Sequence, residues 1–186
     1  MKIGKITTKT EAKSILNYST SNPFTHVLSI QDKGDLWVPR PQFGCEVETL
    51  QFDDLFSPTA ASGPQVHHIR QIISWAQSLP ESSHALVHCV AGVSRSTAAA
   101  LISSVVETGN VSDSVDHVWT IRPQAIPNPL MVWIADKLLG LDGRLFRASE
   151  EAIENTGYII GHAKTTSQVY IDHFEEWWRG LDKGNI

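Results

Sequence analysis

The chain has 186 residues, 41% hydrophobic and 19% charged, which fits one ordinary domain with a real core and excludes a compositionally disordered protein. Its net charge of −5 and isoelectric point of about 5.9 argue against nucleic-acid or anionic-membrane partners, since both attract a basic face. It has no apolar run of roughly 18 residues and no apolar N-terminal signal core, so we expect a cytoplasmic protein.

The first fifty residues predict one helix and two strands. A capping box that opens with Thr8 predicts a helix running to about Tyr18. The β-rich runs over 25–30 and 47–52 are bounded by turn-forming residues and predict two short strands. The segment between them, 31–44, contains two prolines and two glycines, which predict a loop.

The middle of the chain predicts a helix, a strand and a second helix. Residues 57–64 read as a loop, and apolar residues at helical spacing then predict a helix over 66–78. The short apolar run over 84–90 is typical of a strand buried on both faces. Helical spacing returns after Arg95.

The last third predicts mainly helices. Valines at helical spacing indicate a helix over 111–118, and the prolines of segment 122–129 end it. Residues 130–139 resume a helix, and 170–181 form a final amphipathic one. The sequence between them gives no clear pattern, and the chain has no internal repeat.

Strands separated by helical segments predict an α/β protein with a central, mostly parallel sheet flanked by helices. We expect one domain over residues 1–140 and a helical extension over 141–186 packed on it. The sequence does not indicate the oligomeric state.

The stretch LVHCVAGVSRST, residues 86–97, joins the buried strand to the helix that follows. A strand ends at Cys89, a tight turn follows, and a helix begins near Arg95. Such a turn directs successive N–H groups into one concavity, where the helix dipole adds positive potential. Gly92 permits the required backbone curl, and Arg95 can donate to two oxygens of a phosphate. The predicted phosphate-binding positions are Val90, Ala91, Gly92, Val93, Ser94 and Arg95.

The same positive potential stabilises a thiolate at Cys89. A thiolate aimed at a bound phosphoryl group can attack phosphorus in line and form a phosphocysteine. The sequence therefore predicts a phosphate-binding loop, or P-loop, at a strand–helix junction, with Cys89 and Arg95 as its catalytic residues.

This pattern, His-Cys-x-x-Gly-x-x-Arg-Ser, resembles the signature of the cysteine-dependent protein tyrosine phosphatase superfamily. It stands in this chain as His88, Cys89, Gly92, Arg95 and Ser96. The segment IRPQAIPNP and the compact size resemble the small dual-specificity branch, and the resemblance covers roughly residues 20–140. It implies a hydrolase that removes phosphate from phosphotyrosine, with phosphoserine and phosphothreonine left open.

The resemblance also implies a general acid on a loop that follows a strand before the cysteine. The segment LQFDDL offers Asp53 and Asp54. The branch's apolar-x-apolar-x-Asp pattern puts Asp54 in the acid position, and strand alternation places Asp54 on the face of Leu50 and Phe52. We favour Asp54, and Asp53 is the alternative. Asp32 and Asp35 lie too early in the chain to compete well.

Three supporting residues follow from the same resemblance. His88 is expected to order the loop, and Ser96 to hydrogen-bond the sulfur, with a helix N-cap as its alternative role. Asn128 matches an asparagine that braces the phosphate loop, although ordinary turn chemistry between prolines is equally expected.

We expect no cofactor and no metal. Adjacent His67 and His68 should point apart on a helix, which favours a solvated helix start over a metal site. Cys45 is expected to be a small core residue rather than a resolving thiol for Cys89. The uncharged loop positions favour a singly phosphorylated protein or small phosphomonoester as substrate.

Two other functions remain open at this point. The chain could be a phosphate-binding interaction module, a pseudophosphatase without turnover. It could also be a sulfur-transfer or arsenate-reducing enzyme, although those chemistries need a different loop pattern or additional cysteines, and this chain has two in all.

Overall fold

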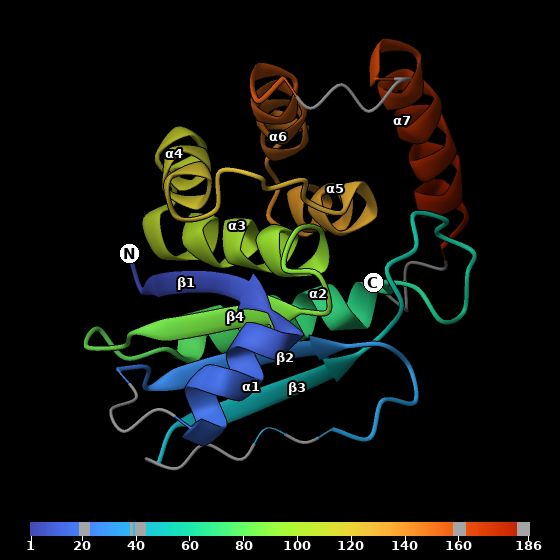
Figure 1. Cartoon of the computed structure of the whole chain (residues 1–186). Helices are drawn as coiled ribbons and strands as arrows, with labels where there is room; N and C mark the ends of the chain where they lie inside the picture. Colours follow the sequence, from blue (N-terminus) through green and yellow to red (C-terminus); the bar gives the residue numbers. More distant parts are fainter. Residues whose placement is uncertain (19–22, 38, 40–43, 158–162, 182–186) are drawn as a thin grey trace.

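The computed structural model describes residues 1–18, 23–37, 39, 44–157 and 163–181. Its centre is a four-stranded sheet in the order β1-β4-β2-β3, in which every strand pairs with its neighbours in parallel (Figure 1). The strands are β1 (Ile3–Thr8), β2 (His26–Gln31), β3 (Glu46–Gln51) and β4 (Ala85–Cys89). The predicted α/β fold with a central parallel sheet is confirmed.

Seven helices are present in the described part of the chain. One lies on one face of the sheet and the others lie on the opposite side or stack beyond it (Figure 1). The helices are α1 (Lys9–Tyr18), α2 (Val66–Ser78), α3 (Arg95–Thr108), α4 (Val111–Ile121), α5 (Pro129–Leu138), α6 (Arg144–Asn155) and α7 (Ala163–Gly180).

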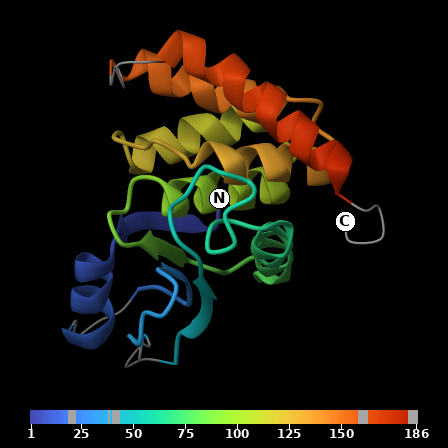
Figure 2. The same ribbon diagram turned by 90° about the vertical axis from the view of Figure 1, so that its right-hand side faces the viewer.

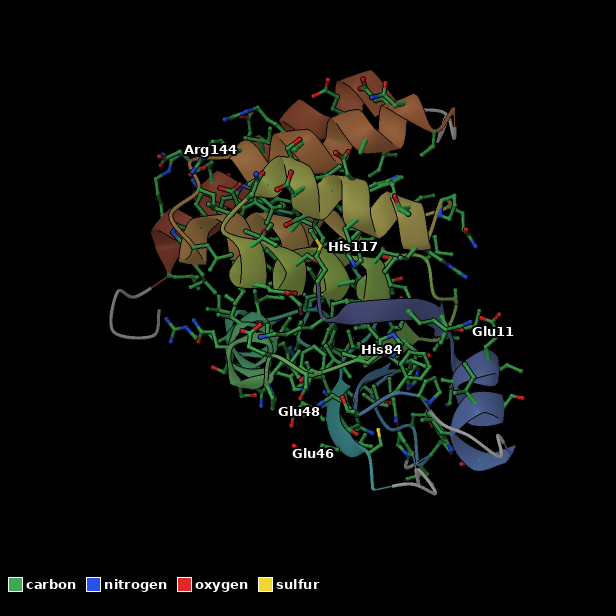
Figure 3. The ribbon with its side chains drawn as sticks, turned by 90° about the vertical axis from the view of Figure 1, so that its left-hand side faces the viewer. Glu11, Glu46, Glu48, His84, His117 and Arg144 are labelled. Carbon is green, nitrogen blue, oxygen red and sulfur yellow. The ribbon has the colours of Figure 1, made fainter. Side chains whose placement is uncertain are left out.

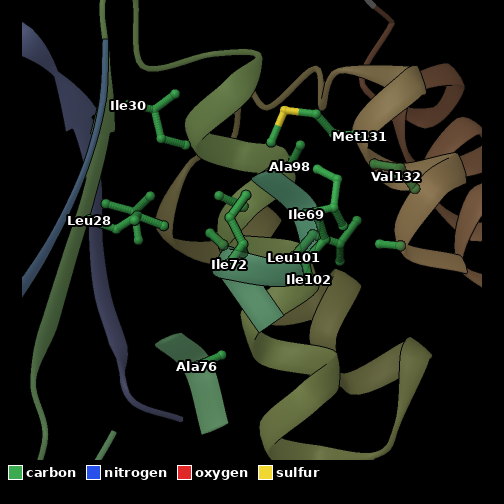
Figure 4. Close-up of a cluster of buried hydrophobic side chains, with 14 of the residues drawn as sticks. Leu28, Ile30, Ile69, Ile72, Ala76, Ala98, Leu101, Ile102, Met131 and Val132 are labelled. Atoms are coloured by element: carbon green, nitrogen blue, oxygen red, sulfur yellow. The ribbon is translucent and has the colours of Figure 1, made fainter. Parts of the chain in front are cut away.

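The two faces of the sheet form two hydrophobic clusters. On one face Val27 and Leu86 pack with Leu16 of α1. On the other face the sheet meets α2, α3 and α5 in a larger cluster (Figure 4). Its labelled side chains are Leu28, Ile30, Ile69, Ile72, Ala76, Ala98, Leu101, Ile102, Met131 and Val132. Because both faces are covered, all of β4 and five of the six residues of β2 are buried.

The first helix begins where its capping box predicts. Glu11 N donates to Thr8 Oγ1 over 3.1 Å, and Thr8 N donates to Glu11 Oε2 over 3.1 Å. Figure 3 shows Glu11 at this end of α1. The predicted helix over 66–78 is also confirmed. Of the loop predicted over 31–44, residues 38 and 40–43 lie outside the described residues.

Strand β1 is missing from the sequence prediction. Ile3 and Ile6 supply its buried face. The register shifts between Ile3 and Lys5, so the sequence does not show the regular alternation of apolar and polar residues that predicts a strand. A Cβ at Gly4 would meet the ring of His84 at 1.8 Å, so a side chain there would have to displace that exposed ring. His117 of α4 contacts the strand from the helical side, with Nε2 2.7 Å from Ile3 O (Figure 3).

Helix α6 is also missing from the prediction, because its start is fixed from another helix. The buried carboxylate of Asp136, on α5, accepts hydrogen bonds from the N–H groups of Gly143, Leu145 and Phe146, at 2.6, 2.7 and 3.1 Å. An acceptor at a helix N-terminus satisfies N–H groups that the helix cannot satisfy itself.

The C-terminal helices share the main core. Leu145 and Phe146 of α6 and Phe174 of α7 are buried in the same cluster as the sheet. Helix α7 begins at Ala163, earlier than the sequence pattern predicts. The division at residue 140 stays a prediction. None of the helices in the described part of the chain combines the length and apolarity needed to cross a membrane.

Parallel pairing brings the carboxyl ends of all four strands to one edge of the sheet, the edge at which α/β proteins bind ligands. Asp32 follows β2, Asp53 and Asp54 follow β3, and Cys89 ends β4. The fold therefore gathers the candidate residues from separate parts of the sequence.

Candidate active site

The thiol of Cys89 lies at the carboxyl end of β4, beneath the turn that leads into α3. The residue is 1% exposed. Gly92 N donates to Cys89 Sγ over 3.2 Å, and Ser96 Oγ lies 3.2 Å from the same sulfur. The sulfur therefore lies where an amide and a hydroxyl converge.

Groups from outside this turn donate hydrogen bonds to its carbonyl oxygens. The first three of these carbonyls belong to residues 90–92. Lys9 N, at the start of α1, donates to Val90 O over 3.1 Å. Arg122, which follows α4, donates through Nε to Gly92 O at 2.8 Å and through Nη2 to Ala91 O at 3.5 Å.

The last two carbonyl groups are held by the segment before α5. Ile126 N donates to Val93 O at 2.9 Å, and Asn128 N donates to Ser94 O at 3.3 Å. Across a planar trans peptide, each carbonyl points opposite to the N–H of the next residue. Because the carbonyls of 90–94 point outward, the N–H groups that follow them point toward the concavity above the sulfur, at the N-terminus of α3. Loops that bind anions have this backbone arrangement, and anion binding at this loop stays a prediction.

Gly92 is required by this turn for two separate reasons. Its φ is +69°, a left-handed conformation that side chains disfavour. A Cβ at this position would also lie 2.6 Å from Thr7 C and 2.8 Å from Thr8 N. The end of β1 therefore packs directly against the loop.

Arg95 is buried at the start of α3, and its guanidinium reaches the ends of two strands. Nη1 donates to Phe52 O at 2.5 Å, and Nη2 lies 2.7 Å from Asp32 Oδ1. Nε is buried and has no hydrogen-bond acceptor among the described residues. A buried guanidinium N–H without an acceptor costs free energy, so an anion in the loop would stabilise it. The two-pronged grip on phosphate stays a prediction.

Asp54 lies beside the loop and Asp53 does not contact it. Asp54 Oδ1 accepts from Ser94 Oγ at 2.7 Å, and Oδ2 lies 4.0 Å from Arg95 Nε. The Asp53 carboxylate instead accepts from Lys33 N at 3.0 Å. That hydrogen bond, followed by one from Ser62, lowers the pKa of Asp53, which favours its ionised form and leaves it less able to hold a proton for a leaving group. The geometry favours Asp54 as the acid.

Asn128 connects α5 with two loops. One is the connection over 52–65 between β3 and α2, called the acid loop here after its candidate acid, and the other is the loop over 90–94, called the phosphate loop. Asn128 Nδ2 donates to Asp54 Oδ1 at 2.8 Å and to Leu55 O at 3.2 Å. Its Oδ1 accepts from Met131 N and so caps α5. Its backbone N–H holds Ser94 O. The side chain thus braces the acid loop, and the backbone braces the phosphate loop.

His88 lies on the opposite side of β4 from the sulfur, packed against the ring of Trp37 at 5.4 Å. Its Nδ1 is 3.5 Å from Cys89 O. Burial lowers the pKa of His88 to about 4, so the ring is neutral at pH 7. It can order the strand end, and it does not contact the thiol.

The structure modifies one expectation about the histidine pair. The rings of His67 and His68 lie 3.9 Å apart rather than pointing away from each other, because His68 turns inward and stacks on Phe52. Burial lowers the pKa of His68 to about 4. Within the described residues no group of three or more His, Cys, Asp or Glu side chains could hold a metal.

Cys45 lies just before β3, at the amino edge of the sheet, and is buried in the cluster under α1. Cys89 lies at the carboxyl edge. The two cysteines form no disulfide. Their placement at opposite edges of the sheet does not favour Cys45 as a resolving thiol.

Sequence reasoning missed Asp32, Arg122 and Lys9. Asp32 was considered only as an acid, yet its position directly after β2 is a signal that could have placed it at the site. Arg122 belongs to a quoted motif, but its contact with Gly92 spans 30 residues of sequence. No local pattern reveals the Lys9 contact, because it depends on the unpredicted β1.

No protein-family model and no curated protein matches the chain, whereas solved structures do. DUSP15 is 21% identical with a TM-score of 0.53, over 78% of this chain and 89% of that one. Human DUSP28 is 15% identical with a TM-score of 0.56, over 77% and 95%. The human tyrosine phosphatase-like serine/threonine/tyrosine-interacting protein is 19% identical with a TM-score of 0.53, over 76% and 93%. These similarities confirm the fold.

Gly92→Ala should disrupt the loop more than the strain of a left-handed alanine would by itself. Gly109→Ala is a matched control, since Gly109 has a φ of +67° and nothing within 4 Å of the added Cβ. The control should lower the free energy of unfolding by about 1–2 kcal/mol. Gly92→Ala should cost about 1–3 kcal/mol more, because backbone must move, and should weaken inorganic phosphate binding by about tenfold or more. Urea unfolding and calorimetric titration measure both. Unchanged phosphate affinity in Gly92→Ala would place the anion site elsewhere.

Proposed function

We propose that this chain, which has the fold of the small dual-specificity phosphatases, hydrolyses phosphomonoesters through a phosphocysteine at Cys89. The observation that carries the proposal is the position of the Cys89 sulfur beneath a loop whose carbonyls all point outward. This leaves inward N–H groups for a phosphoryl group directly above the sulfur, together with Arg95 Nε, which has no hydrogen-bond acceptor among the described residues.

In the first step, the thiolate of Cys89 attacks phosphorus, so the S–P bond forms as the P–O bond to the leaving group breaks. Charge on the phosphoryl oxygens is met by loop N–H groups and by Arg95. The leaving oxygen takes a proton from Asp54. Because Oδ1 already accepts from Ser94 and Asn128, the transferable proton belongs on Oδ2.

In the second step, water attacks the phosphocysteine, and the S–P bond breaks. Asp54 Oδ2, now ionised, takes the proton from the attacking water. Ser96, whose hydroxyl lies 3.2 Å from the sulfur, can donate to the departing thiolate. Inorganic phosphate then leaves the loop, and the starting protonation states are restored.

The loop suits singly phosphorylated groups. Its variable positions, Val90, Ala91, Val93 and Ser94, carry no charge. Additional phosphates on a substrate would therefore gain no cationic partner from the loop side chains. Phosphotyrosine in a protein is the proposed substrate, and phosphoserine, phosphothreonine and small phosphomonoesters are the alternatives.

A phosphate-binding interaction module without turnover is the second candidate. The contacts of Arg95 favour it, because Nη1 and Nη2 already have Phe52 O and Asp32 as acceptors. One protein of the same fold is named as an interacting protein. Such a module would bind phosphate with Cys89 in place but would release no product.

The protein should release phenolate from an aryl phosphate, and a chelator should leave the rate unchanged. Every charge of the reaction is met by backbone amides, Arg95 and Asp54. Cys89→Ser should lower kcat by about 10⁴-fold or more, as removal of a nucleophile does, while inorganic phosphate still binds. Colorimetric kinetics and calorimetry measure these quantities. Phosphate binding without any turnover by the wild type would identify the interaction module instead.

Asp54→Asn should lower kcat for a poor leaving group by about 10²–10⁴-fold, the usual contribution of a positioned acid. The loss should shrink for a phenol that leaves without a proton. Asp53→Asn is the matched control and should change kcat little, since Asp53 contacts Lys33 and Ser62 rather than the loop. A series of aryl phosphates with leaving groups of graded pKa measures the difference.

The wild-type rate should also fall on the alkaline side as the acid ionises, and this limb should disappear in Asp54→Asn. A large, leaving-group-dependent loss in Asp53→Asn alone would reverse the assignment of the two aspartates. No such loss in either variant would place the acid on another loop.

A further inference from the structure

A ring contact joins the acid loop to the C-terminal helix. Phe56, two residues beyond Asp54, meets the ring of Tyr170 on α7 edge-on, with centroids 6.3 Å apart and planes at 89°. Figure 2 shows this loop, which follows β3, facing the viewer with α7 running above it. Phe56 remains 41% exposed, so the contact does not bury the ring in the core.

Tyr170 is itself anchored to the body of the protein. Its ring stacks on Phe174 with centroids 5.7 Å apart and planes at 17°. Phe174 is fully buried and contacts Trp133 of α5 at 5.6 Å. An ion pair between Lys137 and Glu175 joins the same two helices. Tyr170 therefore moves with α5 rather than with the loop.

Helix α5 thus holds the acid loop in two places. At its N-terminus, Asn128 donates to Asp54 Oδ1 and Leu55 O. Through α7, it presents Tyr170 to Phe56. The first attachment fixes the carboxylate, and the second fixes the backbone two residues later. A loop held on both sides of Leu55 loses the swinging motion that would carry Asp54 away from the Cys89 sulfur.

We propose that Tyr170 is a positioning residue for the acid loop, so that α7 contributes to catalysis without touching the substrate. This inference rests on the proposed function, in which Asp54 is the proton donor. The contact joins the two rings, and the Phe56 side chain has no polar atom to which the Tyr170 hydroxyl could hydrogen-bond. Loss of that ring should therefore affect the step that needs the acid and spare the steps that need only Cys89 and the loop.

Tyr170→Ala should lower kcat for an aryl phosphate with a poor leaving group by about 3- to 10-fold, the population shift expected from losing one aromatic pair. For an activated leaving group, kcat should change less than about twofold, because that group departs without a proton. Tyr170→Phe should restore both rates. Glu176→Ala, an exposed substitution on the same helix, should match the wild type. An equal fall for both substrates, or none, would overturn the proposal.

A second measurement does not depend on catalysis. Hydrogen exchange of the loop amides over 54–62 should be faster in Tyr170→Ala than in the wild type and normal in Tyr170→Phe. In a Phe56→Ala background, Tyr170→Ala should add little, since its partner ring is already gone. If the protein turned over no phosphate but showed this exchange pattern, the proposed function would fail and the loop contact would stand. Unchanged exchange in Tyr170→Ala would overturn the contact itself.

Discussion

The loop between β4 and α3 must point five consecutive carbonyl groups outward, and most of the site depends on this constraint. A bare turn would leave those carbonyls free to rotate and the N–H groups free to turn away from the sulfur. Here Lys9, at the start of α1, and Arg122, Ile126 and Asn128, in the connection between α4 and α5, hold them from two separate segments of the chain. The proposed anion site is therefore a product of tertiary packing, although its residues are contiguous.

The same packing connects the acid to the loop. Asn128 holds Ser94 O with its backbone and Asp54 with its side chain, so the phosphate loop and the proposed proton donor share one support. Arg95 extends the connection to the strand ends through Asp32 and Phe52 O. A disturbance at any one of these contacts should therefore reach both the loop over 90–94 and Asp54.

What the sequence predicts well is local, and what it misses is long-range. Cys89, Gly92 and Arg95 lie within seven positions, so their spacing alone predicts their joint chemistry. Leu50 and Phe52 set the alternation that favours Asp54, a preference the geometry supports. Strand β1 is formed by pairing with β4 across an irregular register, and α6 by a cap from Asp136. No local pattern carries such information, nor the contact of Arg122 with Gly92 O. Asp32 differs, because its position directly after β2 indicates a place at the site.

The central claim, a covalent phosphocysteine at Cys89, is tested most directly by trapping it. Asp54→Asn, mixed with an aryl phosphate that has an acidic leaving group, should form the intermediate without an acid and hydrolyse it slowly for want of a base. Rapid denaturing quench and peptide mass mapping should then find phosphate on Cys89, with a burst of about one phenolate per enzyme, and neither in Cys89→Ser. Turnover with no burst, or phosphate on a different residue, would contradict the account.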